Sequence, residues 1–192
     1  MKFRLLIVAA ICVAVLPAAT TEAAKKPQPK PSPAATADPA ADPGPAKPLG
    51  SAGSWSAYLA QNKAGKICYL VGQPAKTEPP GMKRRQVMAM VTHRTEDNVS
   101  NVVSFDEGYA LNENNDVIVE VGTDKFPLFA KDDTAWARTS DLDKTIVTAL
   151  AKGKEAIVRG SPKKGPATVD TYALAGFAKA LDMIDKACDV KR

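Results

Sequence analysis

The residues that could support acid–base or nucleophilic chemistry are few. His93 is the only histidine, and one hypothetical hydrolytic triad combines it with Ser104 and Asp106. Such a triad needs a nucleophile, a base and an orienting carboxylate in contact. Ser104 has no Gly-x-Ser-x-Gly turn around it to expose its hydroxyl. We therefore interpret His93 as a surface residue at the end of a strand, beside Arg94, and predict no catalytic residue.

Acidic pairs do not point to chemistry either. Asp132-Asp133 falls in a turn and Asp141-Asp143 at the start of a helix, where solvation and the helix dipole account for carboxylates. A zinc site needs several His or Cys ligands, which the chain does not offer. Gly50, Gly53 and Gly65 lack the spacing of a phosphate-binding loop. We predict no metal and no cofactor.

Basic residues are spread rather than concentrated. Residues 49–192 carry 20 Lys and Arg against 18 Asp and Glu, a net charge of +2. The clusters Lys83-Arg84-Arg85 and Lys163-Lys164 flank turns, and we interpret both as solvated loops. A nucleic-acid partner would require a concentrated basic face, so no such partner is predicted.

The N-terminus has the pattern of an export signal. Lys2 and Arg4 precede an apolar run over residues 5–16, and small residues follow through Ala23. This pattern predicts a cleaved signal peptide over residues 1–23. The apolar run is shorter than the roughly 20 residues that a membrane-spanning helix needs. We predict a periplasmic or secreted protein whose mature chain has no transmembrane segment.

Signal cleavage removes Cys12 and leaves Cys68 and Cys188. Two cysteines in an exported chain favour a disulfide bond between them. Cys68 falls in an expected strand, and Cys188 ends the apolar stripe of the last helix, so both lie on regular elements. Two free buried thiols are the alternative. A redox-active pair is disfavoured because no Cys-x-x-Cys spacing is present.

A linker separates the signal from the folded part. Residues 25–48 contain eight prolines and no aromatic or large apolar residue, a composition typical of an extended, disordered segment. We place the linker at residues 24–50 and one domain at residues 51–192. The linker is interpreted as a passive tail, with a spacer or a recognition segment as alternatives.

The domain alternates short strands with turn signals every 8 to 12 residues, which is typical of a sandwich or barrel. The expected strands cover residues 55–59, 67–71, 87–92, 98–105, 117–121, 126–130, 134–137, 155–159 and 168–174. Two helices interrupt them: one capped by Ser140 and closing at Gly153, the other over residues 177–188. Core packing is the expected role of the aromatic residues Trp55, Tyr58, Tyr69, Trp136 and Tyr172.

An ordered set of short segments resembles the invasion-associated locus B (IalB) family. The segments are Trp55-Ser56-Ala57-Tyr58, Cys68-Tyr69, Gln73-Pro74, Asn101-Val102-Val103-Ser104, Phe126-Pro127-Leu128-Phe129, Ala135-Trp136, residues 170–176 and Cys188. The resemblance implies a secreted or periplasmic protein with an immunoglobulin-like β-sandwich, in a family named for host-cell invasion. It supplies no catalytic residues.

The sequence therefore predicts a mainly β, immunoglobulin-like β-sandwich with two short helices, one of them C-terminal. The predicted function is that of an exported, non-enzymatic binding module whose partner is an unknown envelope or host-surface protein. A periplasmic hydrolase with an unrecognised carboxylate or serine site, and a purely structural envelope component, remain as alternatives. The sequence leaves the oligomeric state open.

Overall fold

The computed structural model describes residues 45–192, in which eleven strands and two helices form. The strands are β1 (Lys47–Ala52), β2 (Trp55–Gln61), β3 (Lys66–Gly72), β4 (Lys76–Glu78), β5 (Met88–Arg94), β6 (Val99–Asp106), β7 (Val117–Val121), β8 (Asp124–Lys131), β9 (Thr134–Trp136), β10 (Glu155–Gly160) and β11 (Thr168–Ala173). The helices are α1 (Ser140–Lys152) and α2 (Phe177–Ala187). The predicted signal peptide and most of the predicted linker lie outside the described residues.

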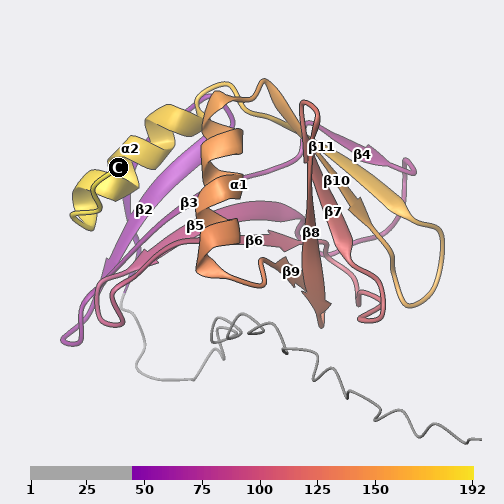
Figure 1. The fold of residues 1–192 in the computed structure, drawn as a ribbon, viewed down its shortest axis with the longest axis horizontal. Coiled ribbons are helices and arrows are strands. Elements are labelled where there is room, and N and C mark those ends of the chain that lie inside the picture. The colour runs from indigo at the N-terminus through magenta and orange to yellow at the C-terminus, as the bar shows by residue number, and fades with distance from the viewer. Residues whose placement is uncertain (1–44) are drawn as a thin grey trace, which may run out of the picture. The chain divides into compact units, whose positions relative to one another are not determined.

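All strand pairs are antiparallel, in the order β1-β2-β3-β5-β6-β9-β8-β7-β10-β11-β4 (Figure 1). Strand β8 joins two parts of this arrangement, because residues 124–128 pair with β7 whereas residues 129–131 pair with β9. We call β1-β2-β3-β5-β6-β9 the first half-sheet and β8-β7-β10-β11-β4 the second half-sheet. The mainly β, sandwich-like architecture with a C-terminal helix is the predicted one.

Aromatic side chains fill the space between the two half-sheets. Tyr172 on β11 contacts Trp55 on β2 and Phe105 on β6, with ring centroids 6.3 and 5.9 Å apart. Trp55 also meets Phe177 edge-on, at 4.9 Å, and its indole N–H donates to the carbonyl of Ala173 at 2.9 Å. A Cβ atom at Gly72 would lie 2.5 Å from the Trp55 ring. Glycine is therefore required where β3 passes this tryptophan.

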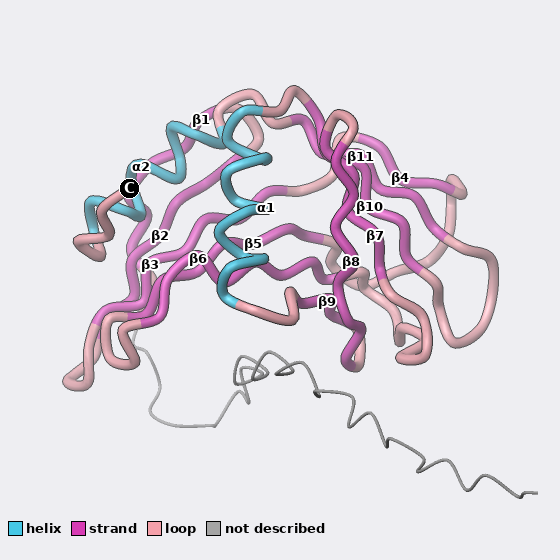
Figure 2. The backbone as a smooth tube through the Cα atoms, in the orientation of Figure 1, coloured by secondary structure: helices cyan, strands magenta, loops and turns pink. Residues whose placement is uncertain are grey.

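Both helices pack on the inner side of the first half-sheet, where Figure 2 shows them in cyan. Helix α2 contacts β1, β2, β3 and β5, and α1 contacts β6, β8 and α2. The cap of α1 is Thr139 rather than the predicted Ser140, because the Thr139 hydroxyl accepts the backbone N–H of Leu142 at 3.2 Å. Within residues 45–192, neither helix has the length and apolar character to span a membrane.

Two strands were not predicted, and one strand changes face along its length. Strand β1 begins at Lys47, inside the segment expected to be linker, and β4 was also missed. In β6 the register shifts opposite His93, where Asn101 has a φ of 65°. Because of this bulge, Val99 lies on the face opposite Val103, whereas strict alternation along a strand would place both on the same face.

Candidate functional site

His93 is buried, not exposed as predicted, with 1% of its surface accessible. Its Nδ1 accepts the backbone N–H of Asn101 at 2.9 Å, closing the bulge, and its Nε2 donates to the Asp185 carboxylate at 2.8 Å. Arg192 donates to the same carboxylate at 2.5 and 2.8 Å. Both ring nitrogens of His93 are therefore engaged, which leaves neither free to act as a general base.

The pKa of Asp185 reflects these contacts. Burial alone would raise the pKa of this carboxyl, but the hydrogen bonds from His93 and Arg192 outweigh burial and lower it. The group is thus a carboxylate that fastens α2 to β5 and to the chain end. Its surroundings indicate a structural role.

The hypothetical triad does not assemble. Ser104 pairs with Met90 and Trp136 on the outer face of the first half-sheet, whereas His93 lies on the inner face. The Asp106 carboxylate accepts the backbone N–H of Gly108 at 2.9 Å. The structure therefore gives His93 no serine partner on its own face.

The basic cluster at residues 83–85 was interpreted as solvated, but Arg84 is buried. Its side chain is 5% exposed, and its guanidinium donates to both Asp170 oxygens at 2.7 and 2.5 Å. Glu107 lies 3.7 Å from the same guanidinium and accepts from the Tyr109 hydroxyl at 3.1 Å. With Thr168, which is 2.5 Å from the Tyr109 oxygen, these residues form a closed group that we call the Arg84 cluster.

The Arg84 cluster is packed too tightly to admit a substrate. A Cβ atom on Gly160 would lie 2.3 Å from the Tyr109 oxygen and 2.8 Å from Glu107 Oε2. Burial and the neighbouring Asp170 carboxylate raise the pKa of Glu107. The cluster joins the loop before β5 to β6 and β11, so its arrangement indicates a buried structural ion pair.

Asp143 was expected to be a solvated residue at the helix start, but it is also buried. Its carboxylate accepts the backbone N–H of Val103 at 2.9 Å. Strand β9 pairs only with residues 104–106 of β6, so Asp143 satisfies a strand edge that β9 does not reach. Burial raises the pKa of Asp143 to about 7.

The cysteines join the C-terminal end of α2 to β3. Sγ of Cys68 and Sγ of Cys188 form a disulfide whose Cα atoms lie 6.0 Å apart, and both residues are buried. Cys68 lies on the inner face with Leu70, opposite Leu59 and His93 on the neighbouring strands. The bond thus holds α2 against the first half-sheet.

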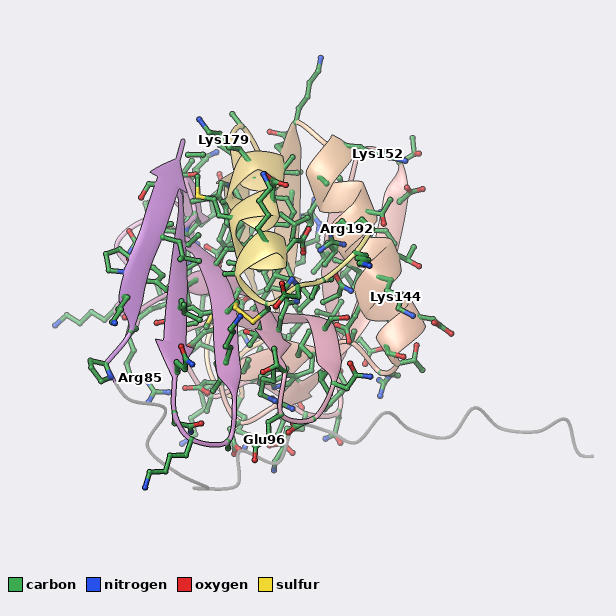
Figure 3. All side chains as sticks on the ribbon, turned by 90° about the vertical axis from the view of Figure 1, so that its left-hand side faces the viewer. Arg85, Glu96, Lys144, Lys152, Lys179 and Arg192 are labelled. Carbon is green, nitrogen blue, oxygen red and sulfur yellow. A yellow bond between two sulfur atoms is a disulfide. The ribbon has the colours of Figure 1, made fainter. Side chains whose placement is uncertain are left out.

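A shallow groove runs along α1 beside the β7–β8 turn. It has a volume of about 560 Å³ and contains Lys152 and Lys154 together with Glu120, Asp124 and Glu155. Figure 3 shows Lys144 and Lys152 projecting from α1. Because both charge signs line this groove, it has no electrostatic preference for a charged ligand. Within residues 45–192, no group of three or more His, Cys, Asp or Glu side chains could hold a metal ion.

The outer face of the first half-sheet is different, because its central residues carry no charge. Two rows of directly opposed side chains cross it, and together we call them the uncharged face. The first row is Pro48, Tyr58, Tyr69, Thr92 and Val102, and the second is Ser51, Ser56, Val71, Met90, Ser104 and Trp136. Most of these side chains are partly exposed, and the rings of Tyr58 and Tyr69 stack at 5.2 Å.

Core packing was predicted for all five aromatic residues, and the structure divides them. Trp55 and Tyr172 are buried, at 1% exposure each, whereas Tyr58, Tyr69 and Trp136 lie on the uncharged face. In Figure 3, α2 and α1 lie on the other side of these strands. Neither helix covers the uncharged face, which is the candidate binding surface.

The comparisons with known proteins agree with this fold. The family model described as invasion associated locus B (IalB) protein matches residues 55–185. This chain belongs to the IalB family. A crystal structure of invasion associated protein b from Bartonella henselae is similar, with a TM-score of 0.54 over 76% of this chain and 99% of that chain, at 18% identity. No curated protein matches this chain.

The part of the chain that the IalB model matches contains most of the features described above. It includes the Arg84 cluster, His93, Asp143, and every residue of the uncharged face except Pro48 and Ser51. The disulfide spans its boundary, since Cys68 lies within the matched residues and Cys188 beyond them. The candidate surface is therefore built mainly on the IalB domain itself.

Proposed function

We propose that this IalB-family protein is an exported, non-enzymatic interaction module of the cell envelope that contacts another protein through its uncharged face. The observation that carries this proposal is the pair of uncharged rows across six strands, with two stacked tyrosines and a tryptophan partly open to solvent. Interaction surfaces in soluble proteins are depleted of charged residues at their centre and enriched in Tyr and Trp, as this face is.

The compartment is supported by two independent features. The pattern at residues 1–23 is typical of a signal peptide for export, and a disulfide that ties the last helix to the sheet is stable in an oxidising compartment. We propose that the mature protein begins at Ala24 and acts in the periplasm or outside the cell. N-terminal sequencing of the exported protein is expected to start at that residue.

Photo-cross-linking in intact cells tests the role of the face. A photoreactive phenylalanine analogue at position 69 is expected to form covalent adducts with a protein, because Tyr69 is partly exposed at the centre of the face. The matched control is the same analogue at Ile118, a partly exposed residue on the outer face of β7. Equal adducts at both positions, or none at either, would overturn the proposal.

A further inference from the structure

The uncharged face has the properties of a surface that pairs with its own copy. In a two-fold symmetric interface the same patch meets itself, so a charge near the axis faces a like charge. The two rows contain no charged side chain. Arg94 and Asp106 lie at opposite ends of the strands, and Arg138 lies beside the end of the second row, over the ring of Phe129, which pairs with Trp136. Within these two rows, self-association therefore brings no like charges together.

The order of side chains along each row is self-complementary. The first row runs from large to small, with Tyr58 and Tyr69 on β2 and β3 followed by Thr92 and Val102 on β5 and β6. A two-fold axis parallel to the strands, between β3 and β5, places β2 of one copy opposite β6 of the other. Tyr58 then faces Val102, and Tyr69 faces Thr92.

The second row behaves in the same way about this axis. Val71 on β3 faces Met90 on β5, and Ser51 on β1 faces Trp136 on β9. Large side chains thus meet small ones at both ends of the row, which is the arrangement that lets two packed sheets interdigitate. Strands aligned in this manner give a sandwich of two sheets about 10 Å apart.

We infer that the partner of the uncharged face is a second copy of this chain, in a two-fold dimer formed by the first half-sheets. This inference rests on the proposed function and names its partner. Six strands span about 24 Å, and the two rows with the residues that flank them cover about 20 Å along each strand. This gives roughly 1,000 Å² buried in total, at the lower limit for a specific interface, with Arg94 and Asp106 at its rim. We therefore expect a weak dimer.

Sedimentation velocity of the purified mature protein from low to high micromolar concentration measures the dimer. Tyr69→Lys and Thr92→Lys each place a charge in the interface and are expected to weaken association about tenfold or more. The control Ile118→Lys is expected to leave it unchanged. Thr92→Lys removes no aromatic packing, and the melting temperature of each variant verifies its fold.

A cross-linking pair tests the geometry. In Y58C/V102C the two positions of one chain are three strand spacings, about 14 Å, apart, but each faces its counterpart across the proposed axis. A short bismaleimide is therefore expected to give a covalent dimer with the double variant, and with a mixture of the two single variants, but with neither single variant alone. Cross-linking within one chain only would contradict this arrangement.

The outcomes separate this inference from the proposed function. A monomer at all concentrations overturns the dimer. If position 69 still photo-cross-links to a different protein in cells, the interaction module stands and its partner is heterologous. A dimer that Tyr69→Lys and Thr92→Lys leave intact also overturns the inference, because a different surface then forms it.

Discussion

The two half-sheets differ in what they present on their outer faces. The uncharged face has no charged side chain in either central row. The outer face of the second half-sheet, which we call the charged face, carries Arg159 paired with Glu120 at 3.2 Å and Lys125 paired with the same carboxylate at 2.8 Å. In both half-sheets, the side chains on the outer face alternate along each strand with side chains that point into the same core. The fold alone therefore does not require either choice, and the difference indicates that the two faces are used differently.

Inside the molecule, charge follows a third pattern. Buried carboxylates occur where a cation or a backbone N–H meets them, as Asp170 meets Arg84 and Asp143 meets Val103. Exposed ion pairs on the charged face are screened by water and salt, whereas buried pairs are not. This contrast predicts that substituting a buried charged residue changes the free energy of unfolding strongly, whereas substituting a residue on an outer face changes it little.

The largest loss of stability is expected for Arg84→Met. Removing this guanidinium leaves the Asp170 carboxylate buried without its cation, which costs about 3–5 kcal/mol of unfolding free energy. Urea denaturation measures the loss. The matched control is Arg85→Met, because the neighbouring side chain is 72% exposed in its pair with Asp133 and its loss is expected to change stability by no more than about 1 kcal/mol. Similar losses for both variants would contradict a buried cluster.

Removing the disulfide is expected to act mainly beneath the uncharged face. Cys68→Ala with Cys188→Ala opens a loop that spans a sequence separation of 120 residues and is expected to cost about 2–5 kcal/mol. Hydrogen exchange should rise in β1, β2, β3 and α2 before it rises in β7 and β10. Cys12→Ala, which the predicted cleavage removes, serves as the control.

The state of the thiols gives a direct test. Alkylation of natively purified protein without reductant is expected to modify neither Cys68 nor Cys188. Modification of both would show that the bond is absent in the cell and would remove the main physical evidence for an oxidising compartment.

The third effect is a fall in stability as the pH rises. Burial raises the pKa of Asp143 to about 7, and burial with a neighbouring carboxylate raises that of Glu107. Both groups bind protons more tightly in the folded state than in the unfolded state. Their contribution to the free energy of unfolding is therefore complete below the unfolded pKa values of 3.8 and 4.5, and it is lost as the pH rises towards 7. The pKa of Asp185 is lowered, so this group changes the free energy of unfolding only at more acid pH, where its carboxylate becomes protonated.

Unfolding free energies at pH 5 and pH 8 measure this dependence. Stability is expected to be lower at pH 8 by at least about 1 kcal/mol. Asp143→Asn should flatten the profile, since asparagine carries no ionisable proton and its side-chain oxygen still accepts the Val103 N–H. Asp141→Asn, on the exposed side of the same helical turn, should leave the profile unchanged. Stability that rises with pH would show that neither carboxyl is protonated on folding.

The strands were predictable because alternation is local. Cys68 and Leu70 share one face of β3, as alternation along a strand predicts, and the C-terminal helix follows its apolar spacing. The spacing of α1 also contained a signal that was not used, because Asp143 precedes Ile146, Val147 and Leu150 at intervals that place all four on the buried side. Strand β1 was missed because proline composition favoured a linker.

The sites were not predictable in the same way, because their partners are remote in sequence. Nothing near Arg84 separates it from Lys83 and Arg85, since its partner Asp170 lies 86 residues away. His93 was misplaced for the same reason, as Asp185 lies 92 residues further along. The uncharged face also depends on register between strands. Tyr58, Tyr69 and Trp136 lie on strands whose alignment in space the sequence pattern does not give.

The smallest effect compares the two outer faces directly through double-mutant cycles. The stacked pair Tyr58 and Tyr69 is expected to show a coupling of about 0.5–1 kcal/mol between Tyr58→Thr and Tyr69→Thr that does not depend on salt. The coupling between Arg159→Gln and Glu120→Gln is expected to be smaller and to decrease as sodium chloride is added, because ions screen exposed charges. Measurement at low protein concentration keeps the dimer from contributing. If added salt reduces both couplings equally, the contrast in charge between the two faces does not determine how the side chains on each face interact.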